Sequence, residues 1–122
     1  MALATVTKAV VTRNASTAAP TFATCATNEG AYITFDKDDQ KILLKIKNQI
    51  TNATHTAVIL AGNGLQGTAN IEIPIAQSSE VVTVIESGKF VNVSGDNKGK
   101  VIVRDKSTTN TNAIAVAAIA LP

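Results

Sequence analysis

Aromatic residues are scarce in this sequence, which has no tryptophan, one tyrosine and three phenylalanines among 122 residues. Carbohydrate-binding modules typically lay aromatic rings against sugars, and proteins that bind single-stranded nucleic acids stack bases on such rings. The four rings, Phe22, Tyr32, Phe35 and Phe90, are spread along the chain. Their scarcity disfavours both functions.

The chain also has a single cysteine, Cys25, and a single histidine, His55. A zinc site needs three or four converging ligands, so one of each is too few. No positive charge near Cys25 would activate its thiol, and we expect a small buried or half-buried thiol. His55 lies between two threonines, and we predict that it is a residue of a loop or of the start of a strand. The sequence therefore predicts a non-enzymatic protein with no catalytic residue, cofactor or metal.

Long apolar runs and an excess of one charge are missing as well. No segment approaches the ~20 apolar residues that span a bilayer, and no basic region precedes an apolar stretch at the start. We expect neither a signal peptide nor a membrane anchor, and synthesis in the cytoplasm. Eleven Lys and Arg stand against nine Asp and Glu. The absence of a basic stripe argues against a nucleic-acid partner.

An acidic cluster, Asp36, Asp38 and Asp39, resembles the opening of a calcium-binding loop. Such a loop needs glycine at its sixth position and an acidic residue at its twelfth. Lys41 and Lys47 occupy these two positions. We therefore predict a solvated hairpin turn.

A glycine-rich segment, residues 95–100, has the general composition of a phosphate-binding loop. Its spacing is one residue short, and Val101 replaces the hydroxyl residue that would hold magnesium. The residues that follow have the pattern of a strand rather than a helix. A turn is predicted here.

From residue 31 onward, apolar residues recur with a period of two, which is typical of strands with one buried face. Turn residues separate the runs, as at Asn63-Gly64 and Ser87-Gly88. About seven short strands at this spacing predict an all-β fold, a single small β-sandwich of immunoglobulin-like or jelly-roll-like type. A small β-barrel is the alternative.

Three local features bear on the strands. Residues 38–50 also have apolar spacing that fits an amphipathic helix, but strand is favoured because β-type segments flank them. Pro74 cannot donate to a ladder, so its strand should lie at a sheet edge or carry a bulge. In the last segment the large residues change phase near Ala117 and Ala118, which predicts a bulge.

Residues 1–29 differ in composition from residues 30–122, because they are rich in Ala and Thr and poor in large apolar side chains. We interpret them as an extended N-terminal arm, with one possible strand around residues 5–10, that adds little to the fold of the following domain. Strand addition to a partner would order such an arm. The candidate partner-contact residues are its larger apolar ones: Val6, Val10, Val11 and Phe22.

Two stretches, AGNGLQGTANIEIPI and VIESGKFVNVSGDNKGKVIV, together with the closing apolar strand, resemble short structural proteins encoded among tailed-bacteriophage head genes. The similarity covers residues 41–122 and points to the head decoration, or cement, proteins. It implies a virion protein on the outer capsid surface that bridges neighbouring major capsid protein subunits. It implies no active-site residues.

Exchange of the arm between copies would favour a symmetric homo-oligomer, with a trimer as one option. Two other functions stay open at this stage. One is a phage tail or fibre-base structural protein, and the other is a carbohydrate-binding adhesion module.

Overall fold

The computed structural model describes residues 3–35, 41–65, 67, 69–85, 87–107 and 113–122. Within these ranges the chain forms ten strands and a single four-residue helix, which confirms the predicted all-β class. In chain order the elements are β1 Ala4–Thr5, β2 Lys8–Val10, β3 Ala23–Thr24, β4 Ala31–Thr34, β5 Ile42–Asn48, β6 His55–Ile59, β7 Ile71–Ile75, β8 Glu80–Val84, α1 Ser87–Phe90, β9 Lys100–Asp105 and β10 Ile114–Ala120.

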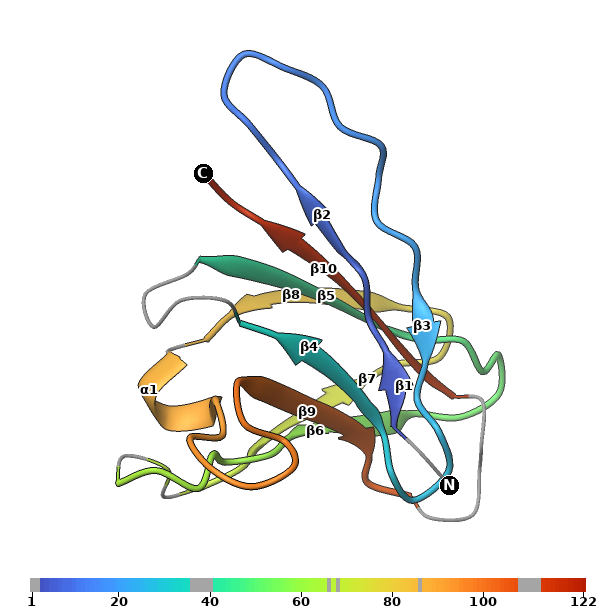
Figure 1. The fold of residues 1–122 in the computed structure, drawn as a ribbon. Coiled ribbons are helices and arrows are strands. Elements are labelled where there is room, and N and C mark those ends of the chain that lie inside the picture. The colour runs from blue at the N-terminus through green and yellow to red at the C-terminus, as the bar shows by residue number, and fades with distance from the viewer. Residues whose placement is uncertain (1–2, 36–40, 66, 68, 86, 108–112) are drawn as a thin grey trace.

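The strands form two sheets that pack against each other (Figure 1). Sheet A has the strand order β1-β4-β9-β6-β7. Sheet B has the order β2-β10-β5-β8, and β3 also pairs with β10. Most neighbours are antiparallel, whereas β1 with β4 and β2 with β10 are parallel. This two-layer arrangement is the predicted β-sandwich.

The core lies between the sheets, because strands on both sides direct their larger aliphatic residues inward. Along β5, buried and half-buried positions alternate, with Ile42, Leu44 and Ile46 inside. The strand prediction is confirmed there, and the helical alternative is wrong for the described residues 41–50. Sheet A contributes buried residues from β4, β6, β9 and β7, among them Ile33, Ile59, Val101, Val103 and Ile75.

β10 runs without the bulge that its sequence predicts. Its pairing with β5 is continuous from Ile114 opposite Asn48 to Ala120 opposite Ile42. The prediction was wrong because Ala118 and Ala120 occupy core positions, while Ile119 lies on the other face. Because alanines fill the core positions at the end of β10, the large residues change to the other face although the strand pairing is continuous.

Pro74 lies in β7, which is the edge strand of sheet A. The edge-strand prediction is confirmed. At this position the missing N–H of proline faces no further strand among the described residues, so no ladder hydrogen bond is lost there.

The N-terminal segment is more closely joined to the sandwich than its composition predicts. β1 pairs with β4 of sheet A, while β2 and β3 pair with β10 of sheet B. Val6 lies where the chain passes from one sheet to the other, and both Val6 and Cys25 belong to the buried core. The expectation that this segment adds little to the fold is therefore corrected. Small Ala and Thr side chains allow close strand pairing even though they bury little surface.

Candidate functional site

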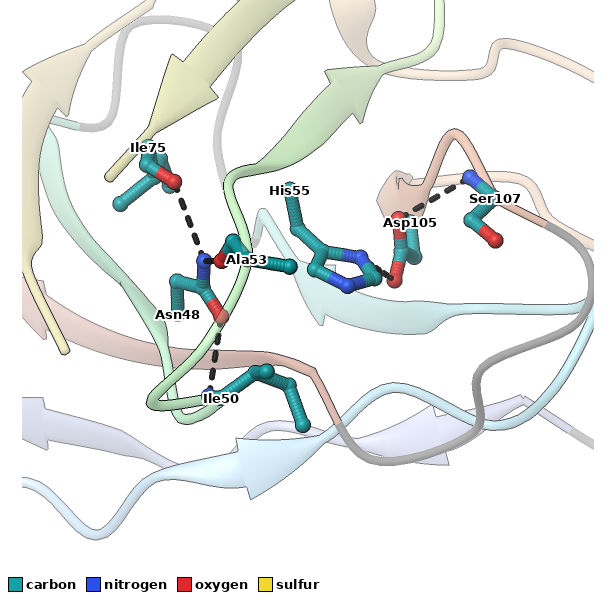
Figure 2. A network of polar contacts seen from close by, with 7 residues as sticks. All are labelled: Asn48, Ile50, Ala53, His55, Ile75, Asp105 and Ser107. Atoms are coloured by element: carbon teal, nitrogen blue, oxygen red, sulfur yellow. Dashed lines mark hydrogen bonds and ion pairs between the residues drawn. The ribbon is translucent and has the colours of Figure 1, made fainter. Parts of the chain in front are cut away.

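A polar pair joins two neighbouring strands of sheet A. His55 begins β6 and Asp105 ends β9, and these strands are antiparallel neighbours. His55 Nδ1 lies 2.9 Å from Asp105 Oδ2, and the side chains are only 11% and 9% exposed. Figure 2 shows the imidazole directed at the carboxylate. The fold has thus brought together two groups that are fifty positions apart in the sequence.

The other carboxylate oxygen of Asp105 is also occupied. Asp105 Oδ1 accepts a hydrogen bond of 3.0 Å from the Ser107 main-chain N–H, a local turn contact that shapes the chain after β9. A shallow surface hollow adjoins the pair. It is lined by Thr54, His55, Thr56, Asp105, Lys106 and Ser107.

A histidine oriented by a carboxylate is one half of the arrangement that activates a nucleophile. The remaining half is a hydroxyl or thiol beside the other ring nitrogen. Ser107 contacts Asp105 through its main chain, and Figure 2 shows it beyond Asp105 as seen from the imidazole. The contact between His55 and Asp105 therefore links the start of β6 to the end of β9.

Cys25 is a buried thiol, as predicted from its neighbours. It is 5% exposed, and its Sγ donates to the Val103 carbonyl oxygen at 3.5 Å. Burial, with a smaller contribution from the nearby Asp105 charge, raises the pKa of Cys25 to about 12, although a backbone hydrogen bond involving Ala31 acts to lower it. A thiol with such a pKa stays protonated at neutral pH and is a poor nucleophile.

The two motif-like segments have different outcomes. The acidic cluster Asp36, Asp38 and Asp39 lies outside the described residues. The glycine-rich segment forms the predicted turn, with Gly95 and Gly99 at φ of 81° and 80°, and leads directly into β9. No helix follows it to present an N-terminus to a phosphate.

The described ranges contain neither a cluster of metal ligands nor a membrane-spanning helix. Across the described ranges, no three His, Cys, Asp or Glu side chains gather in a way that would hold a metal ion. The single described helix, α1, has neither the length nor the apolarity to cross a membrane.

The four arm residues predicted to contact a partner occupy different environments. Val6 is a core residue, Val10 is 61% exposed, and Val11 is half-buried. The Phe22 ring is half-buried and packs near two lysines of β5: Lys47 Nζ lies 4.1 Å from the ring centre and Lys45 Nζ lies 5.6 Å from it. Val10 is thus the one of the four that is mainly exposed.

Asn48 is a buried polar residue that sequence reasoning did not single out. Its Nδ2 donates to the carbonyl oxygens of Ala53 at 2.9 Å and Ile75 at 3.0 Å, and its Oδ1 accepts from Ile50 N–H at 2.9 Å (Figure 2). One side chain therefore links β5 of sheet B, β7 of sheet A and the turn after β5. No motif marks such a residue, because its role depends on segments that meet only in the fold.

Comparisons with known proteins give no match. No family model fits the chain, and neither a curated protein nor a solved structure matches it.

Proposed function

We propose that this chain is a non-enzymatic virion protein of a tailed phage, which binds the outer capsid surface and bridges neighbouring major capsid protein subunits. The observation that carries the proposal is the segment between β2 and β3. This segment extends beyond the body of the sandwich (Figure 1), and residues 12–19 are all exposed. A protruding segment of small and polar residues suits contact across a neighbouring surface.

Apolar side chains accompany this segment at the same end of the sandwich. Val11 N–H donates to the Ala120 carbonyl oxygen at 3.0 Å, which places the end of β2 beside the last residues of the chain. Val10 and Leu121 are exposed there. Protein interfaces combine an apolar centre with a polar rim, and this end offers both.

The described aromatic rings favour the structural role over sugar binding. Lysines already lie over two of them: Lys47 over Phe22, and Lys100 Nζ 4.2 Å from the centre of the Tyr32 ring. Phe35 and Phe90 are buried in the core. A sugar would have to displace a lysine or enter the core in order to stack on any of these rings.

Co-sedimentation with purified capsids that lack their decoration tests the proposal. The full chain should sediment with the capsids, and Val10→Glu should weaken this binding by tenfold or more, because it places a charge in the apolar contact. Val93→Glu is the matched control, since Val93 is similarly exposed but lies in the segment between α1 and β9. It should bind normally.

Equal capsid binding by both variants would show that this end of the molecule does not contact the capsid. If the full chain does not bind capsids but binds purified tails, a tail protein becomes the favoured function. If it does not bind capsids but binds sugars on a glycan array, an adhesion module becomes the favoured function.

A further inference from the structure

Among the described strands, β8 is the sheet edge with the least protection against pairing. It ends sheet B, and no other described strand pairs with its outer side. Proteins protect such edges by shortness, by proline, by charge or by a bulge. β1 and β2 are only two and three residues long, and β7 carries Pro74. β8 has five residues, no proline, and one charge at its start, Glu80.

The hydrogen-bond alternation of the β5–β8 ladder decides which backbone groups face this edge. Asn48 N–H donates to the Ser79 carbonyl oxygen at 2.9 Å, and the bonded positions then recur at every second residue. The N–H and C=O groups of Glu80, Val82 and Val84 therefore point away from β5. These are the groups that a further strand would meet.

The side chains of the same residues lie on the outer face of sheet B. Val82 and Val84 are both more than half exposed, opposite Lys45 and Leu43 of β5. Leu43 in turn lies opposite Ile119 of β10, so an apolar row reaches the edge strand. At the edge this row ends without a covering residue among those described.

We infer that β8 pairs antiparallel with β8 of a second copy of this chain, about a two-fold axis at Val82. In this register Val82 faces its own counterpart and Glu80 faces Val84 of the other copy. All three residues then exchange both of their outward backbone hydrogen bonds. The two valines at position 82 also become neighbours on the outer face, where they extend the apolar surface across both copies.

This register pairs all three outward residues of β8, and its charge placement makes the second copy a suitable occupant. The two Glu80 side chains stand at opposite ends of the pairing, about 13 Å apart along the strands, beyond the Debye length at physiological salt. Each Glu80 is also bound within its own chain by Lys45 Nζ at 3.1 Å. A register with the two Glu80 side chains opposite each other would place like charges together.

The predicted contact is small, because an edge pairing of five residues falls below the area of a standard interface. We expect a reversible dimer whose population rises with concentration. A two-fold dimer also differs from a trimer formed by arm exchange, so the measured mass separates the two. The inference concerns the chain alone and stands whether or not the chain binds capsids.

Sedimentation velocity over a concentration series should show wild-type monomer and dimer in exchange, and Val82→Pro should be monomeric throughout. The Val82 N–H points outward, so proline there removes no ladder bond and is expected to fold, as Pro74 does on the other edge. A wild-type monomer up to about 1 mM would overturn the inference, and so would a Val82→Pro variant that dimerises equally.

Cross-linking provides a measurement that does not depend on the proline variant. A bonded antiparallel pair has a Cα separation of about 5.5 Å, which a disulfide can span. Under mild oxidation, Val82→Cys should form a covalent dimer at least ten times faster than Val93→Cys, whose valine is 56% exposed against 61% for Val82. Equal rates would contradict the pairing. If the wild type is monomeric and Val82→Pro no longer binds capsids, the β8 edge contacts the capsid instead of a second copy.

Discussion

Lys47 Nζ lies 4.1 Å from the centre of the Phe22 ring, so a residue of the N-terminal segment is held against the outer face of sheet B. This contact comes just before β3, where the protruding segment returns to the sandwich. A lysine over an aromatic ring contributes about 0.5–1 kcal/mol at an exposed site. Phe22 thus helps to determine how firmly the segment is attached.

Phe22→Ala should loosen the segment and speed the cleavage by trypsin after Arg13. Arg13 lies in the exposed part of the segment, and cleavage there depends on local opening of the backbone. We expect the fragment ending at Arg13 to appear several times faster, with little change in the global unfolding midpoint. Mass spectrometry of a digestion time course measures this rate. Thr21→Ala is the control, and equal rates in the two variants would show that the ring does not hold the segment.

Asn48→Ala should be among the most destabilising substitutions in the sandwich. It leaves two carbonyl oxygens and one N–H without their partner in a buried region, and we expect a loss of about 2–4 kcal/mol in the free energy of unfolding. Urea denaturation measures the change. Asn52→Ala, in the exposed turn nearby, should change stability by less than about 0.5 kcal/mol. A similar small loss for Asn48→Ala would mean that water replaces its contacts.

Cys25 predicts a loss of stability at alkaline pH. Its pKa is about 12 in the folded chain against an ordinary value of 9.0. As the pH rises above 9, the unfolded chain loses the thiol proton first, so the free energy of unfolding falls by at most about 1.4 kcal/mol per pH unit. Below pH 9 this contribution to stability is fully present.

Cys25→Ala removes that titration at the cost of a small cavity. The difference in the free energy of unfolding between wild type and variant should therefore be larger at pH 7 than at pH 10. Guanidinium unfolding under reducing conditions at both pH values measures this difference. A difference that stays constant would show that the thiol has no raised pKa.

The order of apolar and polar residues within a segment predicted those parts of the fold that depend on that segment alone. The alternation around Ile42, Leu44 and Ile46 was sufficient for β5, and the missing donor of Pro74 was sufficient to place its strand at an edge. The bulge in β10 failed because the prediction followed large residues only, although Ala118 and Ala120 serve as core residues there.

The parts that escaped prediction depend on contacts between distant segments. His55 and Asp105 meet only because β6 pairs with β9, and the pattern of either segment does not reveal its partner. Val6 was assigned to a partner contact because its neighbours are small and polar. In the fold, strands on both sides of Val6 join different sheets, which brings this valine inside.

The parallel pairing of β2 with β10 has a consequence for the rate of folding. Lys8 lies opposite Ala118, so the ladder joins positions about 110 residues apart, and such non-local contacts require an entropic loss of chain freedom before they form. The antiparallel β5–β8 and β6–β7 pairs have much shorter connections. We expect refolding to be slow for a chain of this size, with the N-terminal strand docking late onto a sandwich that is already largely assembled.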